Sequence, residues 1–270
     1  MTWRLLAAPR ADPAPGHARV VAAVHGLADN GTTWQDLAAL LGAGYRWYTV
    51  DAPWSGDPGR SLTDGARPAE WLRQALADLP EPVDILVGHS FGANAVLDHL
   101  ATRPAPEVRA AVLLAPLVRP AEQAPHPVLV ARTRAAIRQV VADGLRARLG
   151  PRAAHVADDV LAAMVDKAVA RVPDGATELV LDRLLATPRP ALGQVNTPAL
   201  VLAGRGDQRL AGVRANSLTV MPAVEVSIHP HYGHFCHITE AAEVAAECAE
   251  FLDRVVPAPS PTGPTLEVVA

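Results

Sequence analysis

The sequence predicts an α/β fold with a mostly parallel β-sheet. Short runs that are apolar on both faces recur along the chain, and such runs are typical of parallel strands buried on both sides. Between them lie segments such as 92–101 and 240–255, where apolar residues recur at helical spacing and polar residues fill the opposite face. Strands that alternate with amphipathic helices indicate a doubly covered, twisted sheet with helices on both faces.

The expected elements follow one another in a regular order with one interruption. Proline residues separate helical patterns in the interruption, because proline cannot continue a helix interior. The expected strands are 19–24, 45–50, 83–87, 108–114, 199–203 and 224–228, and the expected helices of the interruption are 128–149, 154–172 and 177–186. We therefore predict a core of residues 1–116 and 191–256, a helical lid over one end of the sheet at 117–190, and a flexible proline-rich tail at 257–270.

Composition and charge exclude several classes of protein. The chain has 270 residues, of which 50% are hydrophobic and 19% charged, as expected of one folded domain rather than a disordered or fibrous chain. A net charge of -4 gives no broad basic field, so nucleic acid and an anionic membrane are not expected partners. No apolar stretch has the roughly 20 residues of a membrane span, and two cysteines cannot form a disulfide framework. We expect a soluble cytoplasmic protein, and the oligomeric state stays open.

The segment Gly88-His89-Ser90-Phe91-Gly92 joins an apolar strand to a helix of small residues. A nucleophile on such a sharp turn has a strained backbone, and glycines two residues before and after it remove side chains that would clash. The helix that begins there directs its N-terminal amides and positive dipole end toward a developing oxyanion. Ser90 is therefore the candidate nucleophile, and the N–H of Phe91 is a candidate oxyanion donor.

A serine hydroxyl reacts only when a base takes its proton, and a carboxylate must orient that base. Asp207 follows the strand 199–203 at its carboxyl end, where parallel sheets place their sites. His234 stands in a Gly-His loop after the last strand. The chain order Ser90, Asp207, His234 is the order found in hydrolases of this topology. These three residues form a candidate catalytic triad.

With these motifs the chain resembles the α/β-hydrolase superfamily over essentially its whole length apart from the tail. The matching segments are Val24–Leu27 for the oxyanion loop, Gly88–Gly92 for the nucleophile elbow, Gly204–Asp207 for the acid turn and 233–235 for the histidine loop. The resemblance implies an α/β-hydrolase fold, a second oxyanion donor at the N–H of Leu27, and a lid at 117–190. One departure is the segment 51–61, where relatives more often read Asp-x-Pro-Gly-x-Gly-x-Ser and where Trp54 and Asp57 alter the expected pocket rim.

The remaining histidines admit two interpretations. His25 and His89 lie within the motifs and are expected to bond backbone groups around the elbow. The stretch His229, His231, His234, Cys236 and His237 raises a metal hypothesis, since imidazole and thiolate bind transition metals. Its spacing does not secure three or four converging ligands, so we expect neither a metal nor a cofactor.

Aromatic residues are scarce at 4%, and the segment 117–190 has none. If the fold prediction is correct, a few aromatic side chains come from loops at the catalytic end of the sheet. We expect these to form part of the substrate pocket: Trp34, Trp54, Phe91, Tyr232 and Phe235. Trp47, Tyr48 and Trp71 are expected to pack in the core.

The expected function is hydrolysis of an ester, or a thioester, of a medium-sized and largely apolar small molecule through an acyl-enzyme. Acyl pockets of this kind bury most of the ligand against hydrophobic walls. Within the superfamily that the chain resembles, thioester hydrolysis or acyl transfer is the second hypothesis. Cleavage of a carbon–carbon bond or peracid formation is the third. A non-hydrolytic ligand-binding protein, lyase or cyclase of the same fold is the alternative from another class, because fold alone does not fix function.

Overall fold

The computed structural model describes residues 3–7, 18–55, 67–102, 107–117, 127–170, 189–207 and 212–257. These residues form a seven-stranded sheet in the order β1-β3-β2-β4-β5-β6-β7. Every neighbouring pair is parallel except β1 with β3. The strands are β1 (Arg4–Ala7), β2 (Arg19–Val24), β3 (Tyr45–Val50), β4 (Ile85–His89), β5 (Ala110–Leu114), β6 (Ala199–Gly204) and β7 (Val224–His229). The predicted mostly parallel sheet and its six expected strands are confirmed.

The sequence gives little sign of β1. This edge strand has only four residues, reads Arg-Leu-Leu-Ala, and leaves Leu5 half exposed. It pairs antiparallel along one side with β3, and a register shift between Leu5 and Ala7 interrupts the ladder. A short irregular edge strand lacks both the length and the alternation by which strands are recognised in a sequence.

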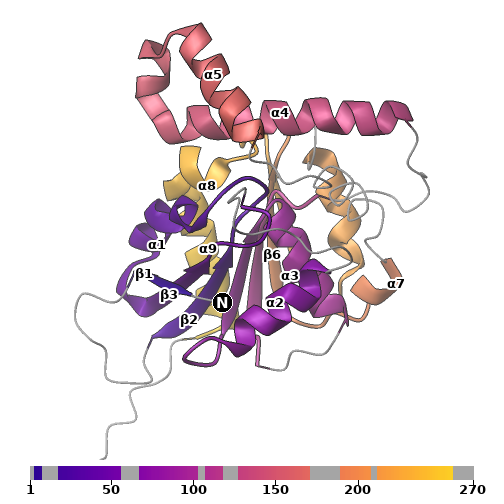
Figure 1. Ribbon diagram of the computed structural model, residues 1–270. Helices are drawn as coiled ribbons and strands as arrows, with labels where there is room; N and C mark the ends of the chain where they lie inside the picture. The colour runs from indigo at the N-terminus through magenta and orange to yellow at the C-terminus, as the bar shows by residue number, and fades with distance from the viewer. Residues whose placement is uncertain are drawn as a thin grey trace, which may run out of the picture.

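Helices cover both faces of the sheet (Figure 1). On one face α1 (Gln35–Leu41) and α9 (Ala241–Val255) bury residues such as Leu37 and Phe251 against alternate strand positions. On the other face α2 (Pro68–Ala77), α3 (Phe91–Thr102) and α7 (Arg189–Leu192) bury Leu72 and Val96 against the intervening positions. Because successive side chains of a strand point to opposite faces, the inner strands β2 to β6 contribute to both cores.

Between β5 and β6 the chain leaves the sheet and forms α4 (Pro127–Leu149), a 3-10 turn at Gly150–His155 and α5 (Asp158–Val169). Helix α4 crosses the end of the sheet at which β4 leads into α3 (Figure 1). Two of the three expected helices are thus present, and the expected helix 177–186 lies outside the described residues. The tail from 258 onward also lies outside them, so the division into core, lid and tail stays a prediction.

Short helical turns complete the connections: η1 (Gly31–Trp34), η2 (Gly42–Gly44), η4 (Gly212–Val220) and α8 (Cys236–Thr239). None of the helices within the described ranges is long and apolar enough to cross a membrane.

The turn after β6 and the loop after β7 pass unusually close to each other. A Cβ atom added to Gly204 would lie 1.6 Å from the backbone oxygen of Tyr232, so no side chain fits there. The amide of Arg205 donates a hydrogen bond of 2.9 Å to the carbonyl of His229, which joins the same two segments. Only glycine at position 204 permits this approach, and the approach brings the segments carrying Asp207 and His234 together.

Replacing Gly204 should lower the stability of the folded protein. We expect Gly204→Ala to lower the free energy of unfolding by more than about 2 kcal/mol, because the new methyl group must displace backbone rather than a side chain. The matched control is Gly44→Ala, where an added Cβ meets nothing within 4 Å, and where stability should stay level or rise by about 0.5 kcal/mol. Urea unfolding curves measure both, and equal effects would contradict the steric explanation.

Candidate active site

Ser90 occupies the turn between β4 and α3 in a strained backbone conformation. Its φ angle is +52°, in the left-handed region that residues with a Cβ seldom adopt. The amide of Ser90 donates to the carbonyl of Leu114 at 2.8 Å, and its carbonyl accepts from the amide of Asn94 at 3.2 Å. These two bonds hold the turn between the neighbouring strand and the first turn of the helix.

The two glycines beside Ser90 are required by contacts with other backbone segments. A Cβ on Gly88 would lie 2.6 Å from the Cα of Ala93, and a Cβ on Gly92 would lie 2.3 Å from the carbonyl oxygen of Val24. Either side chain would force helix α3 away from the strands. The glycine spacing of the motif therefore has the steric cause expected from the sequence.

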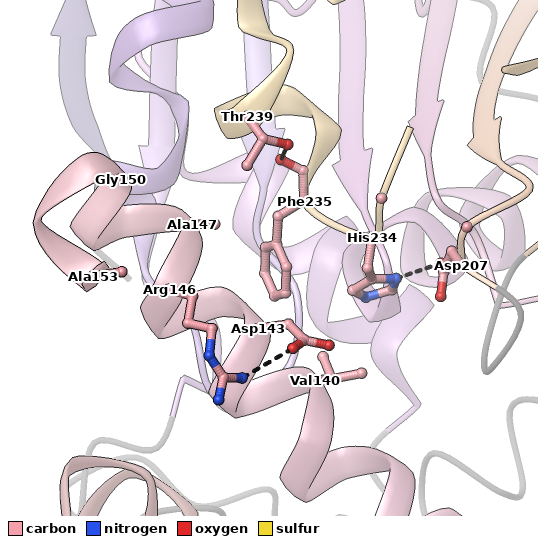
Figure 2. A pocket seen from close by; sticks show the side chains of 12 residues that line it. Val140, Asp143, Arg146, Ala147, Gly150, Ala153, Asp207, His234, Phe235 and Thr239 are labelled. Atoms are coloured by element: carbon pink, nitrogen blue, oxygen red, sulfur yellow. Dashed lines mark hydrogen bonds and ion pairs between the residues drawn. The ribbon is translucent and has the colours of Figure 1, made fainter. Parts of the chain in front are cut away.

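The structure brings Ser90, His234 and Asp207 into one chain of hydrogen bonds. The Oγ of Ser90 lies 3.0 Å from Nε2 of His234. On the other side of the ring, Nδ1 of His234 lies 2.6 Å from Oδ2 of Asp207 (Figure 2). All three side chains are buried. An ionised carboxylate only accepts hydrogen bonds, so Nδ1 carries the proton and Nε2 is left to accept from the serine hydroxyl. This is the arrangement in which a histidine can act as a base toward Ser90.

The predicted oxyanion loop passes directly beside this serine. A Cβ on Gly26 would lie 3.2 Å from Cβ of Ser90, and Leu27 borders a small cavity together with Ser90. Phe91 is fully buried at the start of α3. Leu27 thus lies at the same cavity as Ser90 and Phe91 follows Ser90 directly in the chain, and the oxyanion-donor role of their amides stays a prediction.

Buried groups fix the conformation of the oxyanion loop. His25 bonds the carbonyl of Gly26 through Nδ1 at 2.8 Å and accepts from the amide of Ala52 through Nε2 at 2.9 Å. Burial lowers the pKa of His25, so the ring stays neutral with its proton on Nδ1. Ala28 has a positive φ of 54° and donates to the carbonyl of Trp54 at 2.9 Å. His25 thus has the backbone-bonding role predicted for it.

Two contacts anchor helix α4 over the site. Arg148 forms an ion pair with Asp29, which follows the oxyanion loop by two residues and whose side chain is 2% exposed. Nearby, a Cβ on Gly144 would lie 2.7 Å from the ring of Phe235, so the helix packs directly on the loop that carries His234. Arg148 is one of several arginines on α4, and a pairing with a residue so distant in the chain leaves no local pattern in the sequence.

A layer of buried, neutral imidazoles lies behind His234. Nε2 of His89 donates to the backbone carbonyl of His234 at 2.8 Å, and the His89 and His237 ring centroids are 4.3 Å apart. His237 bonds Oγ1 of Thr33 through Nε2 at 2.9 Å. Burial lowers the pKa of His89 well below its usual range and that of His237 to about 3. His89 therefore bonds backbone near the elbow, as predicted, and supports the histidine loop.

Among the residues that the structure describes, two cavities adjoin His234. A cavity of about 490 Å³ lies between α4 and the loops of Asp207 and His234 (Figure 2); it is lined by Val140, Asp143, Arg146, Ala147, Gly150, Ala153, Gly206, Asp207, Gly233, His234, Phe235 and Thr239. A second cavity of about 20 Å³ is lined by Gly26, Leu27, His89, Ser90, Leu117, Ile137, Val140, Val141, His234 and Phe235. The small cavity is apolar apart from Ser90 and the histidines, whereas the large one also holds the ion pair of Arg146 with Asp143.

The predicted aromatic pocket wall needs correction at four of its five positions. Trp34, Trp54, Phe91 and Tyr232 are fully buried and line neither of these cavities. Only Phe235 of the five borders both. Proximity of a loop to the catalytic end does not determine which way its side chains point.

Each of these four aromatic side chains has a packing partner in the interior. Trp34 packs against Trp47 and His237, with ring centroids 6.5 and 5.1 Å away. Trp54 packs edge-on against Phe91 and Trp71 and donates through Nε1 to the carbonyl of His25 at 3.0 Å. The ring of Tyr232 stacks on His229, and its hydroxyl donates to Glu247 at 2.8 Å. Trp47 and Trp71 are buried, as expected; Asp57 lies outside the described residues.

The histidine-rich stretch is divided among different partners. His229 bonds Glu247 at 3.0 Å, and His231 bonds Glu243 at 2.9 Å, both carboxylates lying on α9. His234 faces Ser90, whereas His237 turns into the interior toward Thr33. Within the part of the chain that the structure describes, no three His, Cys, Asp or Glu side chains gather as they would around a metal ion.

Comparison with known proteins assigns the family. A model of the α/β-hydrolase family matches residues 21–247, which include the oxyanion loop, Ser90, Asp207 and His234. The chain belongs to the α/β-hydrolase family. None of the curated proteins compared with this α/β-hydrolase matches its sequence.

Several solved structures share the fold of this α/β-hydrolase at low sequence identity. A bromoperoxidase from Bacillus anthracis superposes with a TM-score of 0.67 at 20% identity, covering 88% of this chain and 93% of its own. MenH from S. aureus gives 0.66 at 16% identity, covering 93% and 98%. Carboxylesterase CesB from Bacillus subtilis gives 0.60 at 20% identity, covering 93% and 87%. The fold of this chain is therefore shared with proteins that are named for different activities.

Breaking the Arg148–Asp29 pair should destabilise this α/β-hydrolase. Arg148→Met leaves a buried carboxylate without its cation, and because Arg148 is itself 33% exposed we expect a loss of about 1–3 kcal/mol in unfolding free energy. Arg138→Met is the control, since Arg138 and Asp166 are both more than half exposed, and should cost less than about 0.5 kcal/mol. Urea unfolding of both variants measures the difference; equal losses would contradict the anchoring role of Arg148.

Because His237 is buried in its neutral form, we expect the protein to lose stability in acid. Its pKa is about 3 in the folded protein, whereas the unfolded chain takes up the proton near pH 6.5, so unfolding binds a proton between these values. The free energy of unfolding should therefore fall as the pH falls from 6.5 toward 4. In His237→Gln the uptake should decrease by about one proton. Thr33→Val removes the hydrogen-bond partner but no titrating group, and should leave the proton uptake unchanged; an identical pH slope in His237→Gln would refute the assignment.

Proposed function

We propose that this protein is a serine hydrolase that cleaves an ester of a medium-sized, largely apolar small molecule. The observation that carries the proposal is the hydrogen-bonded chain from Ser90 through His234 to Asp207, which lies beside two cavities. Membership of the α/β-hydrolase family supports it. The apolar side chains lining both cavities favour a largely apolar substrate.

Catalysis would proceed in two steps. The Oγ of Ser90 attacks the ester carbonyl carbon while Nε2 of His234 takes the hydroxyl proton, and the carbonyl oxygen becomes an oxyanion. Collapse of this intermediate breaks the bond to the alcohol oxygen, which receives the proton from His234. Water then attacks the acyl-enzyme with the same histidine as base, releasing the acid and restoring Ser90. Asp207 keeps the proton on Nδ1 and stabilises the imidazolium formed in each step.

The amides of Leu27 and Phe91 would bind the oxyanion in both steps. Each donor of this kind contributes roughly 2.7 to 4 kcal/mol to the stability of the transition state. Hydrogen bonds within the protein hold Ala28, His25 and the first turn of α3. Donors held in this way need little reorganisation when charge develops.

Substitution of the three residues tests the proposal through hydrolysis of p-nitrophenyl acetate. We expect Ser90→Ala to lower kcat by at least about 10⁴-fold, and Asp207→Asn to lower it by about 10³- to 10⁴-fold because the histidine tautomer is no longer fixed. Ser227→Ala removes a hydroxyl on β7, away from the cavities, and should retain wild-type activity. Hydrolysis that persists in folded Ser90→Ala would refute the mechanism.

A further inference from the structure

The two cavities beside His234 differ greatly in size and meet different parts of the site. Leu27 and Ser90 line only the cavity of about 20 Å³, which is the side of the oxyanion loop. Asp207 and Gly233 line only the cavity of about 490 Å³, which is the side of the acid and histidine loops. His234 borders both cavities, as do Val140 and Phe235, so these side chains form the boundary between them.

The chemistry of acyl transfer assigns one part of the ester to each cavity. The carbonyl carbon must lie over Ser90 with its oxygen toward the oxyanion loop. Because Ser90 lines the small cavity and not the large one, we assign the acyl chain to the small cavity. The leaving oxygen must lie near Nε2 of His234, because this atom supplies its proton. The alcohol part therefore extends past His234 into the large cavity.

On the basis of the proposed function, we propose that the substrate is an ester of a bulky alcohol with a short acyl group, about the size of an acetyl group. A volume of about 20 Å³ is only slightly more than one water molecule requires, which restricts the acyl chain to a methyl-sized group. A volume of about 490 Å³ is typical of sites that enclose a drug-sized ligand. The bulk of the substrate thus belongs to the alcohol.

Helix α4 sets this size limit. The cavity of about 20 Å³, here called the acyl cavity, is lined on the side of this helix by Ile137, Val140 and Val141. Toward its C-terminal end the helix pairs with Asp29 through Arg148 and packs against Phe235 at Gly144, which holds these apolar side chains beside Ser90. The cavity of about 490 Å³ is called the alcohol cavity. Farther along the same helix, Asp143 and Arg146 give the alcohol cavity a polar edge (Figure 2).

Two matched substrate series test the proposal on the whole protein. At constant leaving group, kcat/KM should fall at least tenfold from p-nitrophenyl acetate to butyrate and again to octanoate. At constant acyl group, biphenyl-4-yl acetate should be cleaved at least as well as phenyl acetate, although its alcohol part is twice as long. A preference for octanoate, or failure to cleave the biphenyl ester, would overturn the proposal about the substrate. If hydrolysis of the other esters still depended on Ser90, the proposed function would stand. Absence of Ser90-dependent hydrolysis of every ester would instead refute the proposed function.

Substitutions in α4 provide an independent arm. Val141→Ala and Ile137→Ala should each raise the ratio of butyrate to acetate hydrolysis at least fivefold, because the acyl cavity gains volume. Val160→Ala removes the same atoms as Val141→Ala from an exposed position on α5 and should leave the ratio unchanged. An unchanged ratio in both α4 variants, with hydrolysis still dependent on Ser90, would contradict the assignment of the acyl group to this cavity.

Discussion

The strained turn at Ser90 is the constraint on which the site depends. A positive φ lifts the hydroxyl above the end of β4 and lets helix α3 begin one residue later. The cost of such a conformation is about 1–3 kcal/mol, and it persists only where surrounding structure determines it. Here the surrounding structure is close backbone packing at Gly88 and Gly92, together with the bond from Ser90 to Leu114. The same close packing places the amide of Phe91 at the N-terminus of helix α3.

The partners of Ser90 are placed by the order of the strands. β6 and β7 lie on the same side of β4, and their carboxyl ends deliver Asp207 and His234 to one edge of the sheet. Glycine at position 204 lets the two following segments touch, and His89 bonds the backbone of His234 from below. Burial keeps His89 and His237 neutral, so the imidazole of His234 has neighbours that add no positive charge.

Different parts of this structure were predictable to different degrees. The inner strands β2 to β6 were recognisable because strands buried on both faces must be apolar, whereas β1 at the edge carries no such pattern. Ser90 was recognisable because its turn places steric demands on adjacent residues. The pairing of Asp29 with Arg148 and the inward direction of Trp34, Trp54 and Tyr232 depend on the packing of distant segments, and no local pattern records them. The separation of two cavities by His234 likewise requires the position of α4.

The central claim is that His234 and Asp207 make Ser90 nucleophilic. Its most direct test is to treat the folded protein with a fluorophosphonate and to locate the modified residue by peptide mass spectrometry. The account predicts one adduct, on Ser90, which is lost in His234→Ala although the serine remains present. Modification of a different residue, or undiminished labelling of Ser90 in folded His234→Ala, would contradict it.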